Sequence, residues 1–255
     1  MAVWAIADLH LSFGTPNKEM DPFGEEWIGH ADKVKKEWEA SIDEEDLILL
    51  AGDLSWAMHI TEAVADLEWL HALPGTKVII RGNHDYWWES LKKLKQHLPP
   101  SIHPVHNTTF NWQGISIAGA RLWDTEELRF GQHITLSANT ISSMPQIDNK
   151  KAEEALTKQR KIFARELNRL ELSLKELDPH ATTRIAMTHY PPISYNLQPS
   201  QTADLLERYN IDICVFGHLH SVDKRAKIFG KRKGIEYHLT SCDYLNFQPL
   251  RILSR

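Results

Sequence analysis

Cysteine is scarce in this sequence, and its scarcity limits the metal and redox chemistry that the chain can support. Only Cys214 and Cys242 occur among the 255 residues, far apart and without C-x-x-C spacing. Disulfide frameworks and thiolate metal sites need several closely spaced cysteines, so we expect neither. Two free thiols and a reducing, cytoplasmic location are the corresponding expectation.

Long apolar runs and an excess of basic residues are also missing. No stretch approaches the ~20 apolar residues that cross a bilayer. Asp8 interrupts the apolar run near the N-terminus, and no basic leader precedes it, so we expect neither a membrane span nor a signal peptide. The formal net charge of -5 argues against a nucleic-acid partner, because surfaces that bind nucleic acid are usually basic.

What the sequence does contain is the composition of a globular domain. Hydrophobic residues make up 42% and charged residues 25% of a chain that is long enough to bury a substantial core. No internal repeat, low-complexity tract or linker divides it. We therefore predict a single domain over residues 1–255, with no evident protein partner.

Predicted strands and helices alternate in the N-terminal part of the chain. Short apolar runs predict buried strands, and apolar residues one helical turn apart predict the helices between them. The strands are predicted at residues 3–7, 47–51 and 77–80. Helices are predicted at 31–40 and 87–97. Another helix is predicted to begin at Thr61 as its cap, with Val64, Leu67 and Leu70 on its apolar face. This alternation is typical of parallel β-α-β units with helices covering the sheet.

The rest of the chain predicts the same architecture with one interruption. Residues 109–112 and 115–118 predict a hairpin, and the segment 121–150 lacks periodicity and is expected to be a substrate loop or lid. An apolar stripe over 151–177 predicts a long helix that packs on the protein's own sheet, with a coiled-coil partner as the alternative. Further strands are predicted at 184–187, 211–216, 235–239 and 250–253, and a further helix at 202–209.

Five of these strands end in side chains that can bind a metal ion. In open α/β sheets the carboxyl ends of neighbouring strands line one crevice, so such endings converge. A single D-x-H or G-D is an ordinary polar turn, whereas in H-x-H the two imidazoles share a face and can reach one metal. The endings are Asp8 and His10, Asp53, Asn83 and His84, His189, and His218 and His220, all without a thiolate.

The order of these endings resembles the calcineurin-like metallophosphoesterases, whose blocks are D-x-H, G-D, G-N-H-D/E, a histidine and G-H-x-H. The blocks here are Asp8-Leu9-His10, Gly52-Asp53, Gly82-Asn83-His84-Asp85, His189 and Gly217-His218-Leu219-His220. The resemblance spans nearly the whole chain. It implies an α/β fold, a four-layer α/β/β/α sandwich, around a dinuclear metal site.

By this resemblance one ion would be held by Asp8, His10, Asp53 and His220, and a second by Asn83, His189 and His218, with Asp53 bridging. A bridging carboxylate is needed because two cations ~3.5–4 Å apart repel each other. Mixed carboxylate, amide and imidazole donors suit Mn²⁺, with Fe and Zn²⁺ as alternatives. A hydroxide shared by the ions would attack phosphorus in line, and His84 would give a proton to the leaving oxygen.

The second block departs from the protein serine/threonine phosphatases of this superfamily, which read G-D-x-x-D-R-G. Here Trp56 stands in place of the aspartate that orients the catalytic histidine, and Ala57 in place of the arginine that grips phosphate. We therefore do not expect a protein phosphatase, and the block is closer to the bacterial phosphohydrolases. How His84 is oriented is left open, because a ring nitrogen normally needs a partner that fixes its tautomer.

Substrate contacts must then come from elsewhere. Arg121 and Trp123 open the irregular segment and are expected to contact the phosphate and the organic group of the substrate, with Arg129 and Phe130 as weaker candidates. A surface salt bridge is the alternative role for Arg121. The basic residues within 224–233 are expected to form a solvated hairpin, with docking of a polyanion as the alternative.

The leading prediction is thus metal-dependent hydrolysis of a small or medium phosphorylated molecule. A nuclease or a nucleotide-lipid diphosphate hydrolase would need a basic groove or an apolar cap, which only the segment 121–150 could build. A non-catalytic scaffold of the same fold is a third possibility. The intact ligand positions and His84 argue against it.

Overall fold

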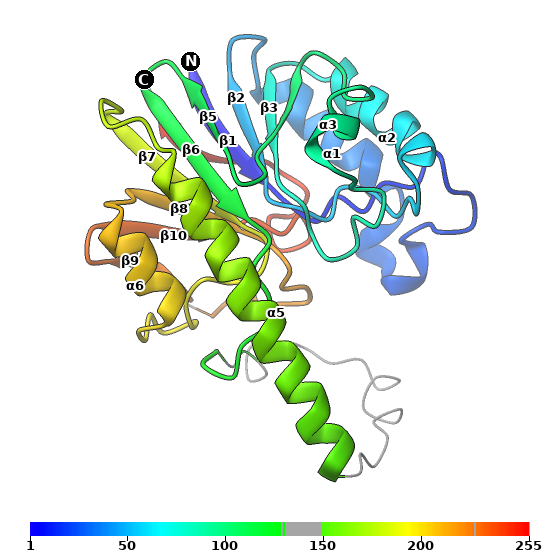
Figure 1. Ribbon diagram of the computed structural model, residues 1–255. Helices are drawn as coiled ribbons and strands as arrows, with labels where there is room; N and C mark the ends of the chain where they lie inside the picture. The colour runs from blue at the N-terminus through cyan, green and yellow to red at the C-terminus, as the bar shows by residue number, and fades with distance from the viewer. Residues whose placement is uncertain (129, 131–148, 227, 255) are drawn as a thin grey trace.

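Two β-sheets lie face to face in the middle of the molecule (Figure 1). The computed structural model describes residues 1–128, 130, 149–226 and 228–254. The first sheet has the order β11 (Leu250–Ser254), β1 (Ala2–Ile6), β2 (Leu47–Leu50), β3 (Thr76–Ile79) and β4 (Ile102–Pro104). The second has the order β5 (Thr109–Trp112), β6 (Ile115–Ala120), β7 (Thr183–Thr188), β8 (Ile213–Phe216), β10 (Ile235–Leu239) and β9 (Gly230–Arg232).

The central strands of both sheets run parallel, as the alternation of strands and helices predicts. In the first sheet parallel pairs run in series from β1 through β2 and β3 to β4. In the second sheet they run from β6 through β7 and β8 to β10. Antiparallel strands β11, β5 and β9 form three of the four outer edges, and the parallel strand β4 forms the fourth. The carboxyl ends of the parallel strands are therefore gathered along one edge of the two sheets.

Alternate residues of each central strand pack into different cores. On β2, Leu47 and Leu49 face the other sheet, while Ile48 and Leu50 face the helices of the first sheet. Those helices are α1 (His30–Ser41), α2 (Ile60–Ala72) and α3 (Leu91–Leu94). On the far side, α5 (Asn149–Lys175) and α6 (Gln201–Arg208) cover the second sheet through buried residues such as Leu174 and Leu206. The layers are α/β/β/α, and the predicted fold class is confirmed.

The start of α2 differs from the prediction that Thr61 caps it. The helix begins at Ile60, and the Glu62 carboxylate accepts hydrogen bonds from the backbone N–H groups of Met58 and His59, at 2.8 and 3.2 Å. Thr61 therefore lies inside the first turn. Val64 is only half-buried, so the buried face is formed by Ile60, Ala63, Asp66, Leu67 and Leu70.

The helix predicted over 87–97 is wrong in its length. Only Leu91–Leu94 is helical, and Trp87 and Trp88 lie in the preceding loop. Both indoles are buried in the core beneath the first sheet, and the Trp87 N–H donates to the Asp85 carboxylate at 3.0 Å. Tertiary burial and this hydrogen bond outweigh the local helical pattern.

Other predicted elements are confirmed with small shifts at their ends. The hairpin β5–β6 turns at Gln113 and Gly114, whose φ angles of 48° and 79° are those of a two-residue turn with left-handed residues. Helix α5 packs on β6 through its C-terminal half, and its N-terminal half projects beyond the sheets in Figure 1. This packing on the protein's own sheet is the one that the apolar stripe predicts.

The basic segment near the C-terminus forms the predicted hairpin β9–β10. Much of its charge is paired: Arg232 and Lys233 contact Glu207, and Lys231 contacts Glu236 at 3.1 Å. Lys227 lies outside the described residues. Cys214 and Cys242 are both buried and free. Within the described part of the chain, no helix is long and apolar enough to span a membrane.

Candidate metal centre

The seven side chains expected to bind metal come together at the carboxyl ends of the parallel strands. Asp8 and His10 follow β1, Asp53 follows β2, Asn83 follows β3, His189 follows β7, and His218 and His220 follow β8. Both sheets therefore contribute to one cluster. Asp8, His10, Asp53 and His189 are buried, and His220 is partly open to solvent.

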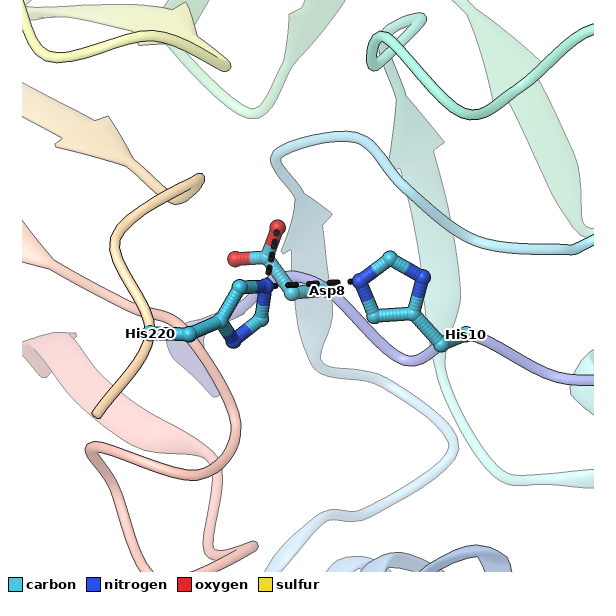
Figure 2. Close-up of side chains that lie close together, drawn as sticks. All are labelled: Asp8, His10 and His220. Carbon is cyan, nitrogen blue, oxygen red and sulfur yellow. Dashed lines mark hydrogen bonds and ion pairs between the residues drawn. The ribbon is translucent and has the colours of Figure 1, made fainter. Parts of the chain in front are cut away.

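The first group of donors consists of Asp8, His10 and His220 (Figure 2). The Nε2 atoms of His10 and His220 face each other at 3.4 Å, and the Asp8 carboxylate lies 3.8 Å from His220 Nε2. Each residue offers one ligand atom, and these atoms lie within 4.8 Å of one another. Two imidazole nitrogens and a carboxylate oxygen aimed at one point can hold a single cation.

The second group surrounds His189. Its Nε2 lies 3.3 Å from Asp53 Oδ2 and 2.7 Å from Asn83 Oδ1, and Asn83 Oδ1 is 3.1 Å from His218 Nδ1. Asp53 Oδ2 is also 3.9 Å from His10 Nε2, so one carboxylate faces both groups. Asp8 Oδ1 lies 3.9 Å from His189 Nδ1, which places it close to the second group as well.

Several of these residues have a backbone conformation that side chains disfavour. The φ angles are 59° at Asp8, 46° at His10, 52° at Asp53 and 71° at His218. A left-handed conformation at a residue other than glycine costs roughly 1–3 kcal/mol and is retained mainly at functional sites. Four strained residues within one cluster indicate that their placement is functional.

Two motif glycines are required by close approach to the ligands. A Cβ atom on Gly82 would overlap the Asp53 carboxylate, and one on Gly217 would overlap the Asp8 carboxylate. Both carboxylates therefore rest directly against backbone that only glycine can provide. The glycines in G-N-H-D and G-H-x-H thus make room for residues of other blocks.

Two further carboxylates, Asp85 and Asp243, hold the ligand loops in place. Asp85 accepts from the backbone N–H groups of Asp53 at 2.9 Å and Gly82 at 2.7 Å. Asp243 lies 3.0 Å from His220 Nδ1, which directs Nε2 toward the cluster. Neither role follows from the sequence motifs alone, because Asp85 ends the G-N-H-D block and Asp243 follows β10 outside any of the five blocks.

The electrostatics of the cluster call for positive charge. Burial raises the pKa of Asp8 to about 6, against the opposing effect of the His220 and His189 imidazoles. Burial also acts on Asp53, but the His189 and His10 imidazoles outweigh it and hold the pKa of Asp53 well below its usual range. Burial alone would lower the pKa of His189, yet the two carboxylates raise that pKa to about 9. Protons or divalent cations can supply this charge.

These residues fit a metal centre by their chemistry. The His189 Nδ1 atom lies 3.0 Å from the Ala51 carbonyl oxygen, so a proton on Nδ1 leaves Nε2 free to act as a ligand. The His10 Nδ1 atom is buried without a hydrogen-bond partner among the described residues. Carboxylate, amide and imidazole donors without thiolate are suited to Mn²⁺, Fe or Zn²⁺.

His84 lies beside the cluster and is positioned by aromatic packing. Its ring lies 4.5 Å from Trp56 and 6.2 Å from Tyr86, and Trp56 also stacks on His10 at 4.8 Å. Burial lowers the pKa of His84, and the Asp53 carboxylate offsets only part of this effect. Trp56, which replaces the expected aspartate, thus orients the His84 ring by contact.

A cavity of about 160 Å³ opens next to His84. Its polar lining consists of His10, His84, His220 and Ser221, and its apolar lining consists of Met20, Phe23, Trp27 and Trp56. Trp27 packs edge-on against His220 at 5.7 Å and is almost fully buried. The sequence analysis did not connect Met20, Phe23 or Trp27 with the site, because they lie in a loop without any metal-binding pattern.

Arg121 and Trp123 follow β6, and the Arg121 carbonyl accepts hydrogen bonds from the backbone N–H groups of His189 and Tyr190 at 3.2 and 3.0 Å. The Arg121 side chain is 11% exposed, pairs with Glu166 at 3.1 Å and lies over the Trp123 ring at 4.7 Å. Trp123 in turn contacts Tyr190, whose ring packs on His218 at 3.9 Å. Phe130 lies 6.1 Å from Phe229, and Arg129 lies outside the described residues. A salt bridge is thus one role of Arg121, and it is buried.

Oxygen and imidazole donors clustered at the strand ends of a two-sheet sandwich define the class of a metal-dependent hydrolase. Residues 1–222 match the family model of the calcineurin-like phosphoesterases, and the chain belongs to this family. The family is one of phosphoesterases.

Comparison with individual proteins gives distant similarities. The gene 66 protein of Mycobacterium phage D29 is 34% identical over 86 residues, which cover 32% of this chain and 40% of the phage protein. The crystal structure of phosphopantetheinyl hydrolase from Mycobacterium tuberculosis aligns with 100% of this chain and 96% of its own, at a TM-score of 0.56 and 16% identity. The calcineurin-like phosphoesterase YfkN from Bacillus subtilis aligns with 94% of this chain and 81% of its own, at a TM-score of 0.45 and 16% identity.

Proposed function

We propose that this protein is a dinuclear-metal phosphoesterase that hydrolyses a phosphate monoester or diester of a small molecule. The observation that supports it best is the position of Asp53, whose Oδ2 lies 3.3 Å from His189 Nε2 and 3.9 Å from His10 Nε2. One ion would be held by Asp8, His10, Asp53 and His220, and the other by Asp53, Asn83, His189 and His218. Mn²⁺ is our first choice, with Fe and Zn²⁺ as alternatives.

The reaction requires the residues around the metal site to position substrate and move a proton. When bound, two divalent cations activate water for attack on phosphorus and take up the charge of the phosphate oxygens. The donors of both groups are already held in converging orientations by Asp85, Asp243 and the Ala51 carbonyl. His84 lies at the edge of this cluster. We assign to His84 the transfer of a proton to the leaving oxygen.

Metal-loaded protein tested on matched substrates would decide between the candidate functions. Hydrolysis of bis-p-nitrophenyl phosphate should be compared with that of p-nitrophenyl phosphate in Mn²⁺, Fe²⁺ and Zn²⁺. A diester preference favours a phosphodiesterase, and the panel should then include a phosphopantetheinyl diester, single-stranded DNA and a nucleotide-lipid diphosphate. Absence of hydrolysis with every metal would support the non-catalytic scaffold.

Asp53→Asn tests the two-metal arrangement directly. This isosteric change should abolish hydrolysis and lower the content of both metals, because the Asp53 carboxylate faces both groups. Metal content measured by mass spectrometry should be compared with that of Asp32→Asn on the exposed face of α1. Two metals retained per chain in Asp53→Asn would refute a bridging role.

Arg121 and Trp123 are proposed as contacts for the phosphate and the organic group of the substrate. The Arg121 guanidinium stacks on the Trp123 ring, and the Arg121 carbonyl accepts hydrogen bonds from the backbone N–H groups of His189 and Tyr190. These contacts support the proposed role of the pair. Arg121→Ala should raise KM or lower kcat on the physiological substrate. Unchanged values of both constants would mean that Arg121 forms its ion pair with Glu166 and does not contact the substrate.

A further inference from the structure

The cavity beside His84 combines a reactive side with an apolar side. Its polar lining comes from His84, from Ser221 and from two residues of the metal cluster, His10 and His220. Its apolar lining comes from Phe23, Trp27, Trp56 and Met20. A substrate atom that reaches the cluster from this side must therefore carry a group that tolerates contact with aromatic rings.

The apolar wall is preformed. Trp56 stacks on His10 at an interplanar angle of 23°, and its indole N–H donates to the Met20 sulfur at 3.2 Å. Trp27 is 3% exposed and packs against the Phe247 ring at 5.4 Å. Rings fixed in this way lose little conformational freedom when a ligand binds, which favours affinity.

Phe23 completes the wall from the rim. It ends the short 3-10 turn Asp21–Phe23, and 64% of its surface is exposed, although it is a large apolar side chain. With the rings of Trp27 and Trp56 it gives the cavity the largely aromatic lining that is usual for small-molecule sites. A bound group that covers Phe23 would remove this surface from water.

We propose that this cavity binds the organic part of the leaving alcohol and that it selects a compact apolar group about the size of a phenyl ring. The inference rests on the proposed function, because a general acid at His84 must touch the leaving oxygen, and the group attached to that oxygen then lies on the same side. The size agrees: the cavity measures about 160 Å³, and an apolar cavity of about 150 Å³ holds benzene.

The reaction that this cavity serves is hydrolysis. Water supplies the oxygen of the new P–O bond, and the P–O bond to the leaving group breaks. The leaving oxygen takes up a proton from His84 and departs as an alcohol, whose apolar part stays against Trp27 and Trp56 until release. The attacking water gives up a proton to solvent, and His84 regains one from solvent before the next turnover. Phosphate, or the phosphate monoester when the substrate is a diester, is the other product.

Two esters whose leaving alcohols have similar acidity isolate the effect of the cavity. Mn²⁺-loaded protein should be assayed with phenethyl phosphate and ethyl phosphate, or with their methyl diesters if diesters are preferred, by measuring the alcohol released. We expect kcat/KM to be on the order of 10- to 100-fold higher for the phenethyl ester, mainly through KM. Phe23→Ser should reduce this ratio by at least about threefold, because the ring loses one contact surface.

Phe13→Ser is the matched control. Phe13 is also largely exposed, at 53%, but it packs near Trp69 and lines a different hollow. Its ratio of phenethyl to ethyl hydrolysis should equal that of the wild type. Equal kcat/KM for the two esters, or an unchanged ratio in Phe23→Ser, would overturn the leaving-group assignment alone. Absence of hydrolysis of both esters with every metal would overturn the proposed function together with it.

Discussion

At the scale of single residues, His84 and the proposed metal ligands are neighbours for which we propose separate roles. His84 packs between Trp56 and Tyr86, and only its backbone N–H bonds to a ligand residue, Asp53, at 2.8 Å. His84→Ala should therefore lower kcat by about 10²- to 10⁴-fold, as expected for loss of a general acid, while metal content stays near that of the wild type. Loss of metal in this variant would show that His84 is a ligand.

His97→Ala is a suitable control for His84→Ala. His97 is exposed, and its Nδ1 lies 3.0 Å from the Lys93 carbonyl oxygen, away from the cluster. Hydrolysis and metal content should both stay at wild-type values. A similar loss of kcat in the two variants would indicate a general effect of histidine removal.

Gly82 provides a second test at this scale. Alanine at this position would place a Cβ against the Asp53 carboxylate, with the backbone of Asp53 immediately behind it. We expect Gly82→Ala to fold but to lose most of its bound metal and its activity, because Asp53 cannot keep its position. Metal analysis with circular dichroism would check this. Wild-type metal content would show that the loop adapts without loss of the site.

At the scale of elements, helix α5 is joined to the end of β6 through one buried carboxylate. Glu166 accepts hydrogen bonds from Arg121 after β6 and from Arg165 and Arg169 on α5 itself. The Glu166 side chain is 2% exposed, so its charge is fully engaged in this network. Removing it leaves the buried Arg121 guanidinium without a counter-charge.

Glu166→Gln should lower the free energy of unfolding by roughly 3 kcal/mol, since breaking a buried ion pair leaves an uncompensated charge. Urea denaturation would measure the change. Glu171→Gln, on the same helix, removes an exposed contact with Lys175 at 3.7 Å and should change stability by about 0–1 kcal/mol. Equal effects of the two substitutions would contradict the anchoring role of Glu166.

At the scale of the whole molecule, a buried lysine makes stability depend on alkaline pH. Lys77 on β3 is fully buried and donates to the Leu73 carbonyl. Burial lowers the pKa of Lys77 to about 8 from 10.5, with Glu44 opposing the shift. The folded state therefore favours the neutral amine. The associated stability is present above pH 10.5 and is lost as the pH falls through 8.

As the pH rises from below 8 to above 10.5, the free energy of unfolding of the wild type should increase by up to about 3 kcal/mol relative to that of Lys77→Met. Urea denaturation of both proteins across this range would test it. Lys175→Met, which removes a lysine that is 56% exposed, is the matched control. A constant difference between the wild type and Lys77→Met would show that Lys77 does not titrate in this way.

Local sequence patterns determined much of this protein's secondary structure and the grouping of its candidate metal-binding residues. The strand endings at Asp8, Asp53 and His189 were predicted as one cluster, because parallel strands bring their carboxyl ends to the same edge. The hairpin at Gln113 followed from turn residues, and the parallel strands from short-range periodicity, whereas the α/β/β/α layers were implied by the family resemblance. A single domain over residues 1–255 and a lid at 121–150 stay predictions, and residues 129 and 131–148 lie outside the described part of the chain.

Only the tertiary structure decided what lies around that cluster. Asp85 and Asp243 support the ligands, and Trp27 and Phe23 wall the cavity, through contacts between segments that are distant in the sequence. The same long-range packing overrode the helical pattern at Trp87. Residue types and spacing determine which atoms can bind a metal. The shape of the space beside them depends on how separate loops pack together, and no local pattern records that.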